Sequence, residues 1–233
     1  MRAVLFDLDG TLLDIDIDAF IRRYFARLGP VVAQVAGDGV TPEQAIDVVM
    51  RSTSAMMRPH PGKTNQNAFD EAFVALTGAD LHLAYERFTE FYETVFPTLR
   101  NGLGPVPGAV EAVEAALGLG LRVAIATNPI FPEVAIRRRM EWAGVSDLDI
   151  PVVTTFELMH ACKPDPGYFL ETAALLGVAP QDCLMVGDDV HLDMPAANVG
   201  MSTYSVGTSR PPAVTFAGSL VELPDLLRRL ARP

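Results

Sequence analysis

The chain has 233 residues, 49% of them hydrophobic and 20% charged, a composition typical of a globular protein with a sizeable core. Its net charge of -11 argues against a general nucleic-acid binder, because few cations are available to neutralise a phosphate backbone. Cys162 and Cys183 are far apart and predict neither a disulfide framework nor a zinc site. The first apolar run is too short for a signal peptide, and no run is long enough to span a bilayer. We therefore expect a cytoplasmic protein that does not contact membranes.

The first predicted strand is the apolar run 3–6, which ends in two carboxylates one residue apart, Asp7 and Asp9. Residues i and i+2 of an extended strand point to the same side, so both carboxylates start out pointing the same way. Gly10 and Thr11 then turn the chain and can expose backbone N–H groups. Paired acids at the carboxyl end of a hydrophobic strand add little stability, but they suit binding a hard cation and attacking phosphorus.

Residues 14–104 show helical patterns and no convincing strand. Apolar residues recur at helical spacing in four stretches, and 58–65 is the clearest loop among them. We predict a separate module of four or more helices inserted after the first strand. Residues 14–18 would lead out to this module, and 101–105 would lead back.

The rest of the chain alternates strand and helix patterns. Apolar runs at 121–127, 150–154, 182–187 and 202–206 predict strands, and helices are expected from near Pro107, over 132–143 and 166–176, and from near Pro224. Near-continuous apolar strands indicate a sheet covered on both faces, and the alternation indicates right-handed βαβ units. The prediction is an α/β protein: a Rossmann-like parallel sheet of about five strands in a core made of 1–13 and 105–233, with an inserted helical module at 14–104.

Polar residues lie at or just beyond the ends of the predicted strands, where an open parallel sheet brings them to one edge. Three or more carboxylates at one edge would repel one another strongly without a cation, so the group implies a bound metal ion. Oxygen ligands without histidine or cysteine favour magnesium over zinc. The residues are Asp7 and Asp9, Thr127 with Asn128, Lys163, and Asp188, Asp189 and Asp193.

These motifs make the chain resemble the haloacid-dehalogenase-like hydrolase superfamily, in its Asp-x-Asp phosphatase group. Four family motifs occur in order: FDLDGTL at 6–12, the strand ending in Thr127, the pair Lys163-Pro164, and GDDVHLD at 187–193. The helical insert is similar to the family's type-1 cap. The resemblance implies a Mg²⁺-dependent phosphatase that hydrolyses a small phosphorylated metabolite through an aspartyl-phosphate intermediate, as a monomer or a homodimer.

Chemistry and resemblance together give the first carboxylates their roles. Asp7 would be the nucleophile, and Asp9 would protonate the leaving alcohol and then take a proton from the attacking water. Magnesium would be held by a carboxylate oxygen of Asp7, the backbone carbonyl of Asp9 and the carboxylate of Asp188.

Four further residues would bind the phosphoryl group. The Thr127 hydroxyl and nearby backbone amides, including those of Gly10 and Asn128, would hold phosphoryl oxygens. Asn128 is also expected to turn the chain. Lys163 would neutralise charge shared by the phosphoryl group and the nucleophile.

Two pairs of residues keep alternative roles. Of Asp189 and Asp193, one could reach the metal and the other could orient Lys163 or a metal-bound water. His60 and Lys63 could contact the leaving group from a loop over the site, or they could be solvated loop residues.

Three other enzyme activities and one non-enzymatic function could use some of the same residues. A 2-haloacid dehalogenase needs no metal and typically has no aspartate at the position of Asp9, so Asp9 and Asp188 argue against it. A phosphomutase is not excluded, and a phosphonate hydrolase would need Lys63 as a Schiff-base lysine. A phospho-accepting receiver domain would lack both the helical insert and Asp9.

Overall fold

The computed structural model describes residues 1–37, 39–207 and 214–231, and its centre is a six-stranded sheet. Every neighbouring pair in the sheet is parallel, which confirms the predicted α/β fold. The strands lie in the order β5-β4-β1-β6-β7-β8. Their bounds are β1 Ala3–Phe6, β4 Arg122–Ile125, β5 Val152–Val153, β6 Cys183–Gly187, β7 Ser202–Val206 and β8 Phe216–Gly218.

Strand β8 was not predicted from the sequence, because its three residues contain neither an apolar run nor a β-branched residue. It forms only by pairing with β7. The helix expected from near Pro107 begins instead at Ala109, after a turn at 107–108.

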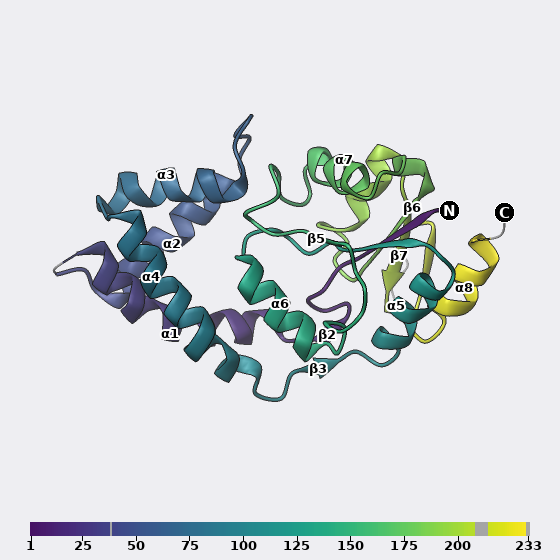
Figure 1. Cartoon of the computed structure of the whole chain (residues 1–233), viewed down its shortest axis with the longest axis horizontal. Coiled ribbons are helices and arrows are strands. Elements are labelled where there is room, and N and C mark those ends of the chain that lie inside the picture. Colours follow the sequence, from purple (N-terminus) through teal and green to yellow (C-terminus); the bar gives the residue numbers. More distant parts are fainter. Residues whose placement is uncertain (38, 208–213, 232–233) are drawn as a thin grey trace.

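Helices cover both faces of the sheet, and β1 shows why its residues are all apolar. Val4 and Phe6 belong to one buried cluster, which also contains residues of α5 (Ala109–Gly118), α6 (Glu133–Trp142) and α8 (Leu223–Leu230). Ala3 and Leu5 belong to the opposite cluster, with residues of α7 (Pro166–Leu175). Figure 1 shows α7 on one side of the strands and α5 and α8 on the other. A strand between two helical layers needs apolar residues on both faces.

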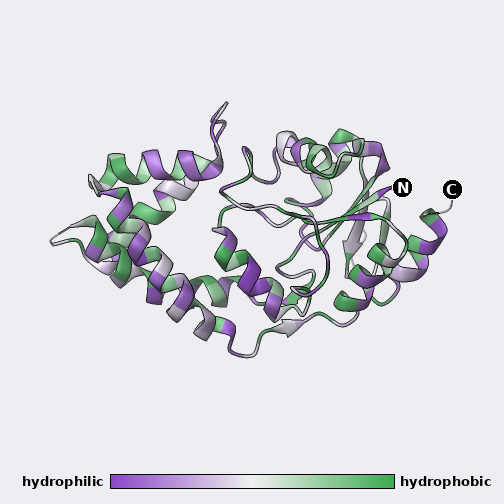
Figure 2. Cartoon of the chain, in the orientation of Figure 1, coloured by the Kyte–Doolittle hydropathy of each residue, from purple (hydrophilic) through white to green (hydrophobic). Residues whose placement is uncertain are grey.

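The segment between β2 and β3 is helical, as expected, and forms the left-hand lobe in Figure 1. It contains α1 (Ile17–Ala36), α2 (Pro42–Met56), α3 (Asn65–Thr77), α4 (Leu81–Glu90), the π-helical η1 (Phe91–Val95) and the 3₁₀-helical η2 (Phe96–Arg100). Capping boxes at Thr41 and Thr64 start α2 and α3. Figure 2 shows hydrophobic and hydrophilic residues side by side along these helices, as amphipathic helices require. We call residues 17–100 the helical insert; the domain boundaries at 13/14 and 104/105 stay a prediction.

The two connections to the helical insert lie side by side. Residues expected as linkers pair in a short antiparallel ladder, β2 (Leu13–Asp14) with β3 (Gly104–Pro105). Phe20 and Phe96 of the insert also pack against Trp142 of α6, with ring centroids 6.2 and 5.5 Å apart. The insert therefore leaves and rejoins the chain beside the carboxyl end of β1. Within the described residues, no helix has the length and apolar character needed to cross a membrane.

Candidate active site

The candidate site lies at the carboxyl ends of β1, β4 and β6, where the strand order changes direction. The chain passes from β1 outward through β4 to β5, then returns to the other side of β1 for β6. Ligands bind in open α/β sheets at this kind of switch point. Backbone bonds hold the ends level: Asp7 N–H donates to Val186 O (2.9 Å) and Ala126 N–H donates to Phe6 O (2.6 Å).

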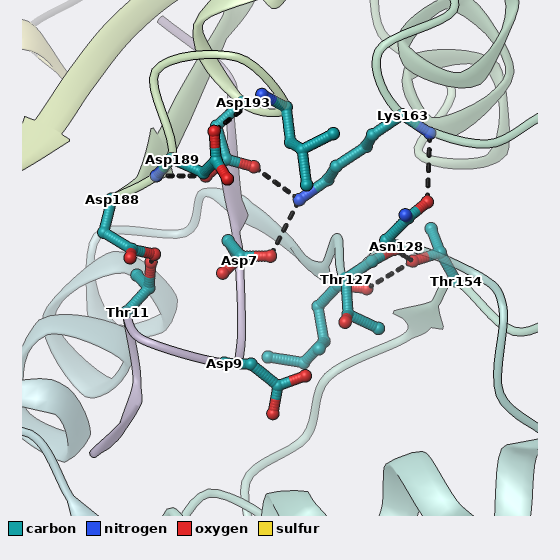
Figure 3. A network of polar contacts seen from close by, with 12 residues as sticks. Asp7, Asp9, Thr11, Thr127, Asn128, Thr154, Lys163, Asp188, Asp189 and Asp193 are labelled. Atoms are coloured by element: carbon teal, nitrogen blue, oxygen red, sulfur yellow. Dashed lines mark hydrogen bonds and ion pairs between the residues drawn. The ribbon is translucent and has the colours of Figure 1, made fainter. Parts of the chain in front are cut away.

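The Lys163 ammonium occupies the centre of the site, as Figure 3 shows. Its Nζ donates to Asp7 Oδ1 at 2.8 Å and to Asp193 Oδ1 at 2.5 Å, and the side chain is buried. Burial opposes the charge, but the carboxylates of Asp193 and Asp7 together raise the pKa of Lys163 above its ordinary value. Lys163 is therefore a fixed positive charge beside the carboxylate of Asp7.

The neighbouring loops are tied to one another. The Asn128 Oδ1 atom accepts from the backbone N–H of Lys163 at 3.1 Å. The Thr127 carbonyl accepts from Thr154 Oγ1 at 2.7 Å and from the Tyr168 hydroxyl at 2.9 Å. The side chain of Asn128 thus positions the loop that carries Lys163, a role that the sequence did not predict. The backbone at Thr127 is held in turn by Thr154, which follows β5, and by Tyr168 of α7.

Three carboxylates converge beside Lys163. Asp7, Asp188 and Asp193 each offer an oxygen within 4.8 Å of the others. Burial raises the pKa of Asp188, and the charge of Asp7 raises it further. Thr11 Oγ1 holds Asp188 by donating to its Oδ1 at 2.8 Å. Clustered oxygen ligands whose mutual repulsion opposes ionisation fit a divalent cation such as Mg²⁺.

Asp189 and Asp193, which follow Asp188 in the same loop, have different contacts. Asp193 accepts from Lys163 through Oδ1 and from the backbone N–H of Asp189 through Oδ2 at 3.1 Å. Asp189 Oδ1 accepts from the backbone N–H groups of His191 (2.7 Å) and Leu192 (3.0 Å). Asp193 thus holds Lys163, while Asp189 stabilises the turn that carries the acids.

Glycines at two positions allow the carboxylates to approach. A Cβ on Gly10, whose φ is +84°, would lie 2.5 Å from Asp188 Oδ2, and a Cβ on Gly187 would lie 2.1 Å from Asp193 Oδ2. Both distances are far below van der Waals contact, so no larger residue fits without movement of the acids. The N–H of Gly10 donates to Leu13 O at 2.9 Å, and its contact with a phosphoryl oxygen stays a prediction.

Asp9 lies apart from the other carboxylates and pairs with Arg139 of α6. Figure 3 shows its side chain pointing away from Asp7 and Lys163. The Arg139 side chain is only 1% exposed, and its guanidinium lies 4.5 Å from the ring centroid of Phe131. Burial raises the pKa of Asp9, although the charge of Arg139 acts against this. Asp9 Oδ1 and Arg139 Nη2 are buried without a hydrogen-bond partner.

Arg139 was not predicted as a site residue, although the sequence contains a signal for it. Arg137 and Arg138 pair with Glu133 and Glu141 on the outside of α6. Arg139, by contrast, is three residues from both Ile136 and Trp142, which are buried, so it falls on the apolar face of the helix. A cation on an apolar helix face predicts a buried partner of opposite charge.

The two insert residues proposed to read the substrate contact other protein groups here. Lys63 Nζ donates to Glu71 Oε2 at 2.6 Å, and the His60 ring contacts Asn65 Oδ1 at 2.9 Å. Asn65 is fully buried and was also missed; its Nδ2 donates to Pro129 O at 3.1 Å. His60 therefore supports the residue that joins α3 to the loop after β4, and a contact of His60 or Lys63 with substrate stays a prediction.

Comparisons with known proteins identify the family and the fold. A family model described as a haloacid dehalogenase-like hydrolase matches residues 1–200. A phosphoglycolate phosphatase of Xylella fastidiosa is 30% identical over 98% of this chain and 92% of its own length. The chloroplastic protein SUPPRESSOR OF QUENCHING 1 of Arabidopsis thaliana is 26% identical over 92% of this chain, which spans 18% of that longer protein. The crystal structure of a HAD phosphatase from Thermococcus onnurineus has a TM-score of 0.59 at 23% identity, covering 97% of this chain and 98% of that one.

Proposed function

Because this chain belongs to the haloacid dehalogenase-like hydrolases, we propose that it is a Mg²⁺-dependent phosphatase of a small phosphorylated metabolite. The observation that carries the proposal is the Lys163 ammonium between Asp7 and Asp193, with Asp188 beside them. A carboxylate next to a fixed cation at the carboxyl edge of a parallel sheet can attack a phosphoryl group. The relative named as a phosphoglycolate phosphatase supports a phosphate ester as the substrate.

In the first step, a carboxylate oxygen of Asp7 attacks phosphorus and the ester P–O bond breaks. The electron pair of that bond leaves with the alcohol oxygen, which takes a proton from Asp9. Asp9 must turn from Arg139 toward the leaving oxygen for this transfer, since it now points away from Asp7. The product is an aspartyl-phosphate on Asp7, together with the free alcohol.

In the second step, water attacks the phosphorus of the aspartyl-phosphate. The water gives a proton to Asp9, the bond between phosphorus and the Asp7 oxygen breaks, and inorganic phosphate is released. Asp7 is then ionised again and Asp9 protonated again, so the cycle closes. Splitting the hydrolysis in two replaces one difficult displacement with two easier ones.

Binding groups surround the phosphoryl position. Lys163 would neutralise its charge, and the Thr127 hydroxyl with the backbone amides of Asn128 and Gly10 would hold its oxygens, the Gly10 N–H on leaving the Leu13 carbonyl. The carboxylates of Asp7 and Asp188 and the backbone carbonyl of Asp9 would hold Mg²⁺, which would supply positive charge to offset the negative charge of substrate and nucleophile. The helical insert would cover the site as a cap, exclude bulk water and contact the alcohol. A cytoplasmic location and a monomeric or homodimeric state stay predictions.

The test is phosphate release from p-nitrophenyl phosphate and a panel of metabolite esters with Mg²⁺. We expect Asp7→Asn to abolish turnover, and Asp9→Asn to slow it while the intact mass reports a phosphorylated protein. Asp147→Asn, an exposed loop aspartate, is the matched control and should retain wild-type turnover. Equal turnover by Asp7→Asn and wild type, or a phosphoprotein that wild type never hydrolyses, would contradict the mechanism.

A further inference from the structure

We infer that a cavity between the helical insert and the core receives the alcohol part of the substrate, and that this alcohol is uncharged and largely apolar. The inference rests on the proposed phosphatase function and specifies its substrate class. The cavity has a volume of about 590 Å³, within the usual size of a small-molecule site. Its walls come from both parts of the chain, so a molecule inside it would touch both.

Phe131 and Arg139 link the cavity to Asp9, the group that would protonate the leaving oxygen, although neither Arg139 nor Asp9 lines the cavity itself. On the core side, its wall includes Ile130 and Phe131, which follow Asn128 in the loop after β4. The ring of Phe131 lies 4.5 Å from the guanidinium of Arg139, and Arg139 pairs with Asp9. An alcohol whose oxygen is attached to phosphorus at Asp7 and reached by Asp9 would therefore extend along this wall.

Apolar side chains dominate the walls. Aromatic rings of Phe25, Phe69 and Phe88 line the insert side. Met50 also lines it and is 49% exposed, so it adds to the apolar surface that a ligand would cover. Burying such a surface against an apolar ligand is favourable, since it removes both surfaces from water.

The charges of the walls disfavour an anionic alcohol. Among the described residues that line the cavity there is no lysine, arginine or histidine, whereas Glu93 and Glu157 are both present. A carboxylate or a second phosphate on the alcohol would thus be desolvated next to two acids, with no cation among the lining residues; the buried Arg139 contacts the ring of Phe131. This separates the chain from its phosphoglycolate phosphatase relative, whose named substrate carries a carboxylate.

Apart from Thr53 and Thr89, the side-chain hydroxyls of the wall already bond to protein groups. The hydroxyls of Tyr24 and Tyr92 bond to each other at 2.7 Å. Gln66 Nε2 donates to the Tyr85 hydroxyl at 3.1 Å, and that hydroxyl donates to Asp70 Oδ1 at 2.6 Å. A polyol would lose hydrogen bonds to water and find these partners already engaged. An apolar alcohol loses no such bonds.

A series of n-alkyl phosphates tests the inference, because from ethyl to hexyl phosphate the leaving oxygen changes little while the apolar length grows. We expect kcat/KM to rise about two- to fourfold per methylene until the cavity is filled. Propyl phosphate should exceed phosphoglycolate, which is similar in size but carries a carboxylate. A flat series, or faster turnover of phosphoglycolate than of propyl phosphate, would overturn the inference. Absence of phosphate release from every ester, p-nitrophenyl phosphate included, would instead refute the phosphatase function.

A pair of variants locates the effect. Met50→Glu puts a charge into the cavity, and Leu83→Glu is the matched control, since Leu83 is 59% exposed on α4 and does not line the cavity. Met50→Glu should lower kcat/KM for hexyl phosphate at least tenfold more than for ethyl phosphate, whereas Leu83→Glu should change both equally. If Met50→Glu also changes kcat/KM for hexyl and ethyl phosphate equally, the cavity does not bind the alkyl chain, and the inference fails.

Discussion

Replacing Arg139 by methionine is the sharpest test of how the core is held together at the candidate site. The variant keeps an unbranched apolar stem but removes the charge that faces Asp9. Breaking a buried ion pair by removing one partner costs roughly 3–5 kcal/mol, since the other charge stays buried and uncompensated. The Asp9 side chain is 16% exposed and therefore keeps some contact with water. We expect Arg139→Met to lower the free energy of unfolding by about 2–4 kcal/mol.

Urea denaturation of four proteins measures the interaction: wild type, Arg139→Met, Asp9→Asn and the double variant. Asp9→Asn leaves the Arg139 charge buried, so each single change should be costly. The double variant has no unpaired charge and should be more stable than the sum of the single effects predicts. The coupling free energy should reach about 2 kcal/mol, well above the roughly 0.5 kcal/mol expected for independent sites.

Arg138→Met is the matched control for this cycle, because Arg138 precedes Arg139 on the same helix. It contacts Glu141 at 2.7 Å, but the two side chains are 35% and 45% exposed to water. An exposed ion pair contributes at most about 1 kcal/mol, so this substitution should have little effect. A coupling between Asp9 and Arg139 below about 0.5 kcal/mol, or an equal loss in Arg138→Met, would refute the reasoning.

Three more outcomes are expected. Lys163→Met should lower kcat for p-nitrophenyl phosphate about 10²- to 10³-fold, because a buried ammonium at the reacting group is lost. Arg228→Met, which removes an exposed cation on α8, should change kcat less than twofold, and equal effects would contradict the assignment. Gly187→Ala should lower the melting temperature, since overpacking costs roughly 1–3 kcal/mol and the new Cβ would lie 2.1 Å from Asp193 Oδ2. Gly118→Ala, with open space around it, should be neutral or stabilising. A lower melting temperature for Gly118→Ala than for Gly187→Ala would show that the acids move freely. A chelator should abolish turnover and Mg²⁺ should restore it and raise the melting temperature; turnover unchanged by chelation would rule out the metal site.

Much of the fold could be predicted because its signals are local. The runs around Val4, Val123 and Leu184 are apolar on both faces and became the central strands, and proline-started patterns gave the positions of α6 and α7 to within a residue or two. Strand β8 and the ladder of β2 with β3 lack such a signal. These short segments are strands only because a partner strand lies beside them.

The candidate site divides in the same way. Motif spacing, together with the rule that parallel strands end at one edge, was enough to bring Asp7, Lys163 and Asp188 together. The pairing of Asp9 with Arg139 was not predicted, since the two residues are 130 positions apart and no pattern links them. Which late acid holds Lys163 was also open, and the loop geometry assigns that contact to Asp193.

For this protein the sequence alone determined the parallel sheet, the helical insert and the chemical types of the groups at the sheet edge, because hydrophobic periodicity and strand-end motifs depend on near neighbours. Only the tertiary structure decided the partner of each charge and the largely apolar lining of the cavity beside Phe131. Those properties depend on which distant side chains become neighbours when burial removes water from between them.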